Sequence, residues 1–367
     1  MTGFSVGAAV TRAAAAVMFY FLFRFFWELF PFSPKGSWKS RILSAVCAVF
    51  CGWFIWPFYG VGAMWVLHFA AACLFTLLLH LILRRTKFGR GKLWKVLAHC
   101  YLPGLALMAG VLGYGYWNMH RVVRTEYQID AEKDVPETGI RIAAFSDLHL
   151  GLNMDAEKLA EYCAEIEAEQ PDMLLLAGDI FDESTERAEM ERAAEILGGV
   201  ETAYGTFFVF GNHDPNLYSP SPAYTAEELR ETLEKNGVTV LEDEIRELGD
   251  SILLIGRKDA STGGNREAIE DLVSGLDPEK LWILMDHQPR GLAENAEAGI
   301  DIQISGHTHA GQMWPAGPVL EWAGINEMNY GLRYMGDTAV IVSSGIAGWG
   351  YPMKTGGPCE YLIIEVS

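Results

Sequence analysis

The hydrophobic positions of this chain follow two patterns that change near residue 120. From Ile42 to Leu83 no residue is charged, and this stretch is twice the ~20 residues that one membrane-spanning helix needs. Pro57, Gly60 and Gly62 lie near its middle, where turn formers predict a helical hairpin. The first part of the chain is therefore built for a lipid environment.

Two further apolar stretches flank this hairpin. One covers residues 96–117, and a weaker one covers residues 8–30 with Arg12, Arg24 and Glu28 inside it. A cleaved signal peptide is the alternative for the weaker stretch, although no small-residue cleavage site follows it. We expect an all-α transmembrane domain over residues 1–120 with about four spans, near residues 8–30, 42–58, 62–83 and 96–117.

Beyond residue 121 the pattern changes to short apolar runs that alternate with amphipathic stretches. The runs predict strands, and the amphipathic stretches at 154–170 and 185–197 predict helices. This alternation is typical of the α/β class, in which about 245 residues commonly form one domain, so we expect a single domain over residues 121–367. The predicted strands are 140–145, 173–177, 206–210, 281–285 and 300–304.

Charge separates the same two parts. Residues 1–120 contain eleven Lys and Arg and one acid, whereas residues 121–367 contain seventeen Lys and Arg and 46 acids. Lys and Arg are retained on the cytoplasmic side of a membrane, and they cluster at 35–41 and 84–95, on both sides of the hairpin. We therefore expect a multi-pass membrane protein with an extracytoplasmic second domain. Its acidic character excludes nucleic acid as a partner, because phosphate binding needs a basic stripe.

All five histidines beyond residue 121 fall in short polar runs, and most of these runs follow a predicted strand. Imidazole next to carboxylate or amide is the mixed ligand set that suits Mn, Fe, Zn or Ni. Open α/β sheets build their sites at the carboxyl ends of strands, so we expect a metal site there. The runs are Ser146-Asp147-Leu148-His149, Gly178-Asp179, Gly211-Asn212-His213-Asp214, Asp286-His287-Gln288-Pro289 and Ser305-Gly306-His307-Thr308-His309.

These five runs, in this order, resemble the calcineurin-like metallophosphoesterase superfamily, in particular its membrane-anchored bacterial phosphodiesterases. The resemblance covers roughly residues 122–367. It implies two mixed β-sheets sandwiched between helices in four layers, with a dinuclear metal site at the strand ends.

Carried over by motif, one metal is expected on Asp147, His149, Asp179 and His309. The other is expected on Asp179, Asn212, His287 and His307, with Asp179 as the bridge. Two cations about 3.5–4 Å apart need a shared anionic ligand, and together they acidify a bridging water to hydroxide. We expect that hydroxide to be the nucleophile. The two divalent ions are Mn, Fe, Zn or Ni, with Mn favoured.

His213 has no metal in this assignment, and a phosphoester leaving group needs a proton. We expect His213 to be the general acid and the adjacent Asp214 to orient it or raise its pKa. The alternatives are that His213 only hydrogen-bonds phosphate and that Asp214 only holds a turn before Pro215.

Two positions depart from the pattern of the resembling bacterial proteins. Ala310 stands where they commonly have Gly, and Pro358-Cys359-Glu360 stands where they commonly have Pro-Pro-Glu. Asp286 adds charge near the metals or points away. An aromatic cluster follows the last ligand and forms either core or an amphipathic rim that meets lipid: Trp314, Trp322, Tyr330, Tyr334, Trp349 and Tyr351.

The expected function is a metal-dependent phosphoesterase, more specifically a phosphodiesterase, that cleaves a phosphate ester or pyrophosphate of an envelope or lipid-linked substrate. One alternative is a cytoplasm-facing pyrophosphatase of nucleotide-linked lipids. Another is a membrane scaffold that binds metal without turnover. The sequence leaves the oligomeric state open.

Overall fold

A computed structural model describes the chain except for residues 1, 30–37, 54–59, 134, 137–138 and 262–265. The described residues form two compact units. The helical unit comprises residues 1–115 with 350–352. The other unit, which we call the catalytic unit because the sequence predicts the metal site in it, comprises residues 116–349 with 353–367.

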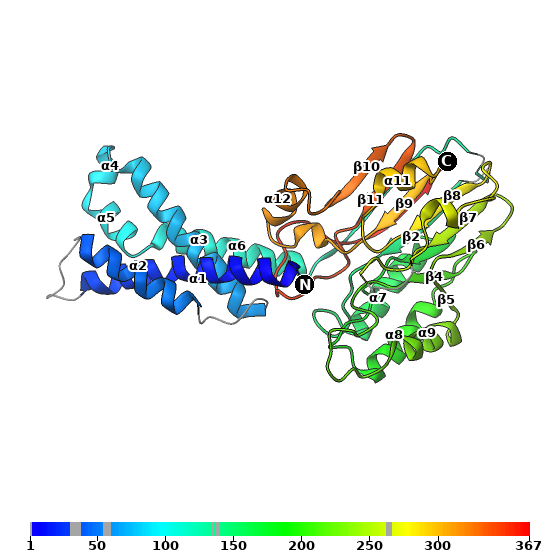
Figure 1. Cartoon of the computed structure of the whole chain (residues 1–367), viewed down its shortest axis with the longest axis horizontal. Coiled ribbons are helices and arrows are strands. Elements are labelled where there is room, and N and C mark those ends of the chain that lie inside the picture. Colours follow the sequence, from blue (N-terminus) through cyan, green and yellow to red (C-terminus); the bar gives the residue numbers. More distant parts are fainter. Residues whose placement is uncertain (1, 30–37, 54–59, 134, 137–138, 262–265) are drawn as a thin grey trace. The chain divides into compact units, whose positions relative to one another are not determined.

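The helical unit contains six helices among its described residues (Figure 1). One of them, α3, is long and apolar enough to cross a bilayer, and α5 with α6 makes a second such segment if the bent pair is counted as one span. The turn expected at Pro57 lies outside the described residues, and the four-span arrangement stays a prediction. The helices are α1 (Thr2–Leu29), α2 (Trp38–Trp53), α3 (Gly60–Leu83), α4 (Lys87–Arg90), α5 (Lys92–His99) and α6 (Leu102–Met119).

The expected continuous span at 96–117 is broken, because α5 and α6 meet at a bend of 54°. Pro103 explains the break: it has no N–H and fits the first turn of a helix, but it disrupts a helix interior. Tyr101, between the two helices, has a left-handed φ of 55°. Gly104 then lies so close to α3 that an added Cβ would be 1.9 Å from the Ala72 carbonyl oxygen, the small-residue contact that membrane helices favour.

The catalytic unit contains two mixed six-stranded sheets, which confirms the predicted fold class. Sheet A has the order β1-β12-β2-β3-β4-β5, and sheet B has the order β10-β11-β9-β8-β7-β6. Sheet A consists of β1 (Val122–Ile129), β12 (Cys359–Val366), β2 (Ile140–Phe145), β3 (Met173–Leu176), β4 (Thr206–Val209) and β5 (Val238–Leu241). Sheet B consists of β10 (Gly331–Met335), β11 (Thr338–Val342), β9 (Ile302–Ser305), β8 (Leu281–Met285), β7 (Ile252–Gly256) and β6 (Glu244–Leu248).

Alternate residues of the buried strands enter different cores, because successive side chains point to opposite faces of a sheet. In β3, Met173 and Leu175 join the core between the two sheets, whereas Leu174 and Leu176 join the core under the helices of sheet A. In β8, Trp282 and Leu284 similarly face the helix that covers sheet B. Both faces of each sheet are therefore apolar, as continuous hydrophobic runs predict.

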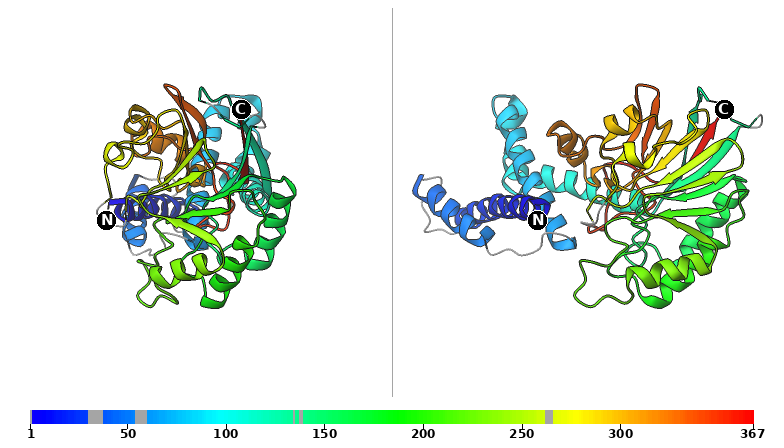
Figure 2. Two further views of the ribbon diagram at one scale, coloured as in Figure 1. Left: turned by 90° about the vertical axis from the view of Figure 1, so that its right-hand side faces the viewer. Right: turned by 45° about the vertical axis from the view of Figure 1, so that its right-hand side comes forward.

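Helices cover the outer face of each sheet, which gives the four layers (Figures 1 and 2). On sheet A these are α7 (Ala156–Ala168), α8 (Arg187–Gly198) and α9 (Ala226–Lys235). On sheet B they are α10 (Ile269–Leu272) and α11 (Leu292–Glu297). A 3-10 turn, η1 (His309–Gly311), and a short helix, α12 (Ala316–Trp322), follow β9.

The strands that carry the polar runs are parallel within their sheets. In sheet A, β2 through β5 are parallel neighbours, and in sheet B, β7, β8, β9 and β11 are parallel. Their carboxyl ends therefore lie along one edge of each sheet. The loops after β2, β3, β4, β8 and β9 present the polar runs at these edges.

Candidate metal centre

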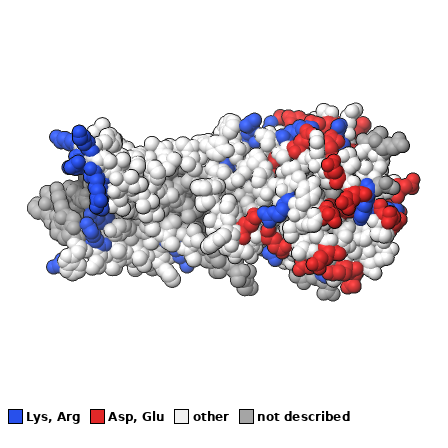
Figure 3. All heavy atoms as spheres, turned by 90° about the horizontal axis from the view of Figure 1, so that it is seen from above, with Lys and Arg blue, Asp and Glu red and all other residues white. Residues whose placement is uncertain are grey.

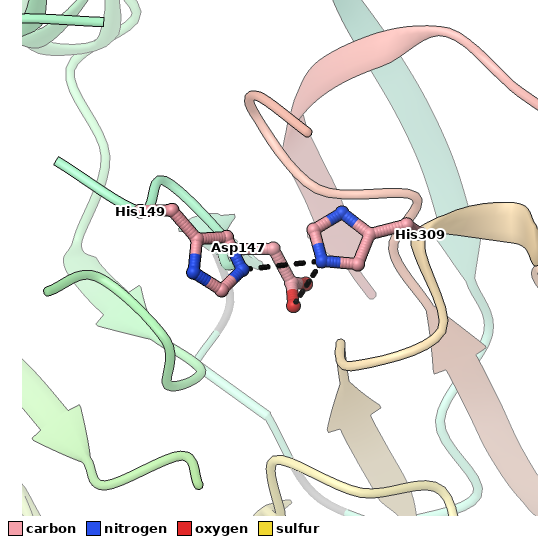
Figure 4. Close-up of side chains that lie close together, drawn as sticks. All are labelled: Asp147, His149 and His309. Atoms are coloured by element: carbon pink, nitrogen blue, oxygen red, sulfur yellow. Dashed lines mark hydrogen bonds and ion pairs between the residues drawn. The ribbon is translucent and has the colours of Figure 1, made fainter. Parts of the chain in front are cut away.

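Three of the predicted ligands form what we call the first ligand group: Asp147 and His149 after β2, and His309 after β9 (Figure 4). The Nε2 atoms of His149 and His309 are 3.2 Å apart. His309 Nε2 is also 3.5 Å from Asp147 Oδ1. Two side chains from sheet A and one from sheet B thus point at one another.

Three more predicted ligands form the second ligand group: Asp179 after β3, His287 after β8 and His307 after β9. Asp179 Oδ2 is 3.1 Å from His287 Nε2 and 4.0 Å from His149 Nε2. The Asp179 carboxylate therefore lies between the two groups. Asn212, the remaining predicted ligand, is buried at the end of the loop after β4.

The backbone is strained at these positions. Five of the seven predicted metal ligands have left-handed φ values, between 45° and 69°: Asp147, His149, Asp179, His307 and His309. Such values are uncommon for residues other than Gly and concentrate at functional sites. Gly211 allows the loops to approach, since a Cβ there would lie 2.2 Å from Asp179 Oδ1.

Several buried polar atoms are arranged for metal coordination rather than for hydrogen bonds with one another. Asn212 Oδ1 is buried without a hydrogen-bond partner among the described residues, and His287 Nε2 faces the Asp179 carboxylate. Two imidazole Nε2 atoms at 3.2 Å can share one proton at most, and buried polar groups left unpaired are costly. Lone pairs that converge in this way, with carboxylates beside them, match the N/O donor set of a divalent transition metal.

Hydrogen bonds from the other ring nitrogen orient two of the imidazoles. His149 Nδ1 is 3.1 Å from Asp182 Oδ2, and His287 Nδ1 is 2.9 Å from the Ala177 carbonyl oxygen. Metal-bound histidines almost always donate their second N–H to such an acceptor, which leaves the Nε2 lone pair for the metal. A side-chain carboxylate orients His149, whereas the backbone orients His287.

Burial sets the charge state of two other histidines. It lowers the pKa of His307 to about 4, helped by the neighbouring His287. Burial, and the charges of His149 and Lys354, lower the pKa of His309 well below its usual range. Both imidazoles are therefore neutral near pH 7, as metal ligands must be.

The second group holds an ion pair. Burial lowers the pKa of His287, but the Asp179 carboxylate outweighs it and raises the pKa well above its usual range. The pKa of Asp179 is in turn well below its usual value, because the attraction of His287, His213 and His149 outweighs burial. In the first group, burial and the charge of Asp179 raise the pKa of Asp147.

His213 contacts a different carboxylate from the one that the sequence predicted. Its Nδ1 is 2.9 Å from Glu183 Oε2 and 3.7 Å from Asp182 Oδ2, and its backbone N–H donates to Asp179 Oδ1. Burial lowers the pKa of His213, but the hydrogen bond with Glu183 and the nearby carboxylates raise it to about 9. The imidazole is thus held in the protonated form that a general acid requires.

Asp214 occupies a structural position instead. Its two carboxylate oxygens accept the backbone N–H groups of Asp179, Phe181 and Gly211 at 2.6–2.8 Å. It therefore ties the loop after β3 to the loop after β4. These contacts favour the alternative in which Asp214 holds a turn, and the helper role stays a prediction.

Sequence reasoning missed three residues around the site and left the role of a fourth, Trp349, open. Asp182 and Glu183 follow Asp179 in the same loop, and this proximity in the sequence could have identified them. Trp349, whose Nε1 donates to Asp182 Oδ2 at 3.1 Å, lies 5.0 Å from the His213 ring. Lys354 is completely buried and donates to the carbonyl oxygens of Ser344, Gly345 and Ala347, and no motif signals it.

The residues at the unusual sequence positions have definite places. Ala310 has a left-handed φ of 53°, which explains why Gly is common there in resembling proteins. Glu360 is buried and accepts hydrogen bonds from Ser344 N and Thr125 Oγ1. Asp286 is buried and paired with Arg266, so it points away from the two ligand groups.

Comparison with known proteins gives a family match and several similar proteins. Residues 140–311 match the family model described as calcineurin-like phosphoesterase. An uncharacterized metallophosphoesterase of Helicobacter pylori is 30% identical over 62% of this chain and 60% of its own length. One from Aquifex aeolicus is 29% identical over 66% of this chain and 90% of its own length.

A third relative is named for a membrane segment. It is a transmembrane protein with metallophosphoesterase domain from Danio rerio, 30% identical over 70% of this chain and 60% of its own length. This chain thus spans 60% of the Helicobacter and Danio relatives. Residues 140–311 thus match the calcineurin-like phosphoesterase family, and the chain is similar to proteins named metallophosphoesterases.

Proposed function

We propose that this protein is a membrane-anchored phosphodiesterase that uses two divalent metal ions. One observation carries the proposal: carboxylates and imidazoles from the loops after β2, β3, β8 and β9 converge around Asp179, and Asn212 Oδ1, from the loop after β4, is buried without a partner among the described residues. Asp147, His149, Asp179 and His309 would hold one ion, and Asp179, Asn212, His287 and His307 the other. Bound there, the ions would act as Lewis acids and lower the pKa of water.

The protein's own contribution centres on His213. Glu183 holds the imidazole by Nδ1, which leaves Nε2–H to donate a proton to a leaving-group oxygen. Tyr218 and Trp349 flank the ring, with centroids 5.2 and 5.0 Å away, and limit its movement. His213 is thereby positioned as the acid, with Glu183 as its partner.

Local charge favours a diester over a monoester. Asp182 and Glu183 stand beside His213, and a phosphomonoester carries about two negative charges at neutral pH where a diester carries one. Repulsion from the carboxylates therefore weakens monoester binding more. A lipid-linked phosphodiester fits both this preference and membrane attachment.

We further propose that residues 1–120 anchor residues 121–367 at the outer face of the membrane. Figure 3 shows Lys and Arg gathered at one end of the helical unit, as the positive-inside rule requires of a cytoplasmic end. Fusion of a fluorescent protein after residue 367 tests the orientation. Bright cytoplasmic fluorescence would contradict it and favour the cytoplasm-facing pyrophosphatase.

The catalytic role is tested with aryl phosphodiesters whose leaving groups differ in pKa. His213→Gln should lower kcat roughly 10²- to 10⁴-fold on the poorest leaving group, and much less on bis-p-nitrophenyl phosphate, because p-nitrophenolate leaves without a proton. Metal content should stay unchanged. His120→Gln, a change at an exposed histidine, is the control.

Two outcomes would contradict this role. An equal loss of kcat on every leaving group would remove His213 as the acid. A wild-type protein that binds metal but turns over no phosphoester would favour the non-catalytic scaffold.

A further inference from the structure

An apolar patch lies on the catalytic unit just beyond the metal centre. We define it as Trp314, Val319, Trp322 and Ile325, with exposed fractions of 71, 50, 88 and 61%. These four side chains fall within twelve residues, on and around α12. Clustered exposed hydrophobic residues mark interaction sites, whereas scattered ones do not.

The patch is the outer face of a well-anchored element. On the inner face of α12, Gly317 is buried, and a Cβ there would lie 2.7 Å from the Ala310 carbonyl oxygen. Val319 and Trp322, three positions apart, share the opposite face of the helix. The side chains are thus exposed because the backbone beneath them is packed against the loop that carries His309.

Charge is almost absent around the patch, although the catalytic unit is strongly acidic. From Ile302 to Asn326 the chain carries one charged residue, Glu321, and its carboxylate pairs with Arg333. The remainder of the unit would be repelled by an anionic membrane surface. This segment combines neutrality with exposed indole rings, which favour the membrane interface.

Hydrogen bonds connect the patch to the end of α6. Trp314 N donates to Thr355 Oγ1 at 3.0 Å. On either side of Thr355, the carbonyl oxygens of Lys354 and Gly357 accept hydrogen bonds from Asn118 Nδ2 at 3.0 and 2.8 Å. Asn118 is the penultimate residue of α6, the apolar helix through which the chain enters the catalytic unit.

The same helix end carries exposed aromatic rings. Tyr116 and Trp117 are 60 and 53% exposed, and such rings at the end of an apolar helix favour the headgroup level of a bilayer. Hydrogen bonds through Thr355 and its neighbours therefore connect Trp314 to the last turn of α6, which carries these rings.

Hydrogen bonds also connect the patch to the metal centre. Gln312 N donates to the His309 carbonyl oxygen at 2.8 Å, and Gln312 Oε1 accepts Trp349 N at 3.0 Å. Trp349 in turn contacts His213 and Asp182. Only four residues separate His309 from Trp314 along the chain.

We propose that Trp314, Val319, Trp322 and Ile325 dock into the headgroup region of the protein's own bilayer and present the metal centre to phosphodiesters of that bilayer. The inference rests on the proposed hydrolase function for its substrate and on the proposed anchor for its partner. The substrate class is a phospholipid diester that is attacked without leaving the membrane.

Docking is tested by fluorescence, independently of activity. The full chain is reconstituted in vesicles of phosphatidylcholine and phosphatidylglycerol with and without brominated acyl chains. The difference in tryptophan emission between the wild type and Trp322→Phe gives the emission of Trp322. Brominated lipid should quench this emission strongly. Trp282 is a buried indole packed against the helix on sheet B. Its emission, obtained in the same way from Trp282→Phe, should be unaffected by bromine. Equal quenching of the Trp322 and Trp282 emissions would overturn docking. Quenching of Trp322 that vanishes as the protein is diluted in the bilayer would also overturn it and would indicate a second copy as the partner.

Substrate presentation is tested by activity on two substrates. Trp314→Ser with Trp322→Ser should lower turnover of a vesicle-embedded phospholipid at least tenfold and leave kcat/KM for bis-p-nitrophenyl phosphate unchanged. Tyr334→Ser, an exposed residue of β10 outside the patch, is the matched control and should change neither.

The outcomes separate the two proposals. Equal activity of the double variant and wild type on the embedded lipid would overturn presentation. Quenching of Trp322 without any hydrolysis of either substrate by the wild type would leave docking standing and contradict the hydrolase.

Discussion

The two ligand groups are built from the same residue types but differ in what balances their charge. In the first, the Nε2 atoms of His149 and His309 oppose each other at 3.2 Å, and burial keeps His309 neutral. In the second, His287 and Asp179 form an ion pair at 3.1 Å. In the second group, the proton on His287 therefore balances the charge of the Asp179 carboxylate. In the first group, His309 is neutral, and its lone pair is available to a metal.

The groups also differ in what orients the histidine from behind. A side chain, Asp182, bonds His149, whereas a backbone carbonyl, that of Ala177, bonds His287. A substitution can therefore remove the acceptor behind His149, whereas the backbone acceptor behind His287 is fixed by the fold. We therefore expect the two proposed ions to differ in affinity and in the dependence of that affinity on pH.

Removal of the shared carboxylate should have the largest effect. Asp179→Asn removes the charge that lies between the groups and faces both His287 and His149. We expect neither ion to be retained and phosphodiesterase activity to fall below detection, measured by elemental analysis and turnover. Asp250→Asn, on an exposed turn, should keep both. Retention of two ions by Asp179→Asn would contradict the proposal that Asp179 bridges them.

A change behind His149 should affect the first group alone. Asp182→Asn weakens the hydrogen bond that orients the imidazole, and loss of such a partner typically lowers metal affinity roughly 10- to 100-fold. Titration with a competing chelator should show one ion weakened and one unchanged, with Asp250→Asn again as the control. Equal weakening of both ions would erase the distinction between the groups.

The pH should affect the second group more. The pKa of His287 lies well above its usual range in the metal-free protein, so near pH 7 a metal must displace its proton. The affinity should rise with pH below that pKa, by about tenfold per pH unit for one proton released. Calorimetry in buffers of different ionisation enthalpy measures the proton. Identical pH slopes for both ions would contradict this difference.

The smallest effect concerns the loop that carries His309. Ala310→Gly relieves a left-handed φ of 53°, which should raise the free energy of unfolding by about 1 kcal/mol without a change in metal content. Ala164→Gly, inside α7, should lower it by about 1 kcal/mol. Thermal unfolding compares the two. Destabilisation by Ala310→Gly would show that the backbone there is not strained.

Much of the catalytic fold was predictable because its strands are buried on both faces. Continuous apolar runs located β2, β3, β4, β8 and β9 to within about two residues, and each run ended in a polar motif. The edge strand β6 escaped prediction because three of its five side chains are exposed, and neither a long apolar run nor a motif marks it.

The contacts of the site were less predictable than its composition. Adjacency in sequence suggested Asp214 as the partner of His213, but the tight turn directs Asp214 to backbone N–H groups and leaves Glu183 at the imidazole. Pairings of this kind depend on loop conformation. The buried Lys354, which holds three carbonyl oxygens, has no signature in local sequence.

The central claim is that two divalent ions share Asp179, and anomalous diffraction tests it most directly. Crystals of the full chain grown with Mn²⁺ should show two strong anomalous peaks. One should lie among Asp147, His149 and His309, and the other among Asn212, His287 and His307, with Asp179 bound to both. No peak, a single peak, or peaks away from these side chains would contradict the account.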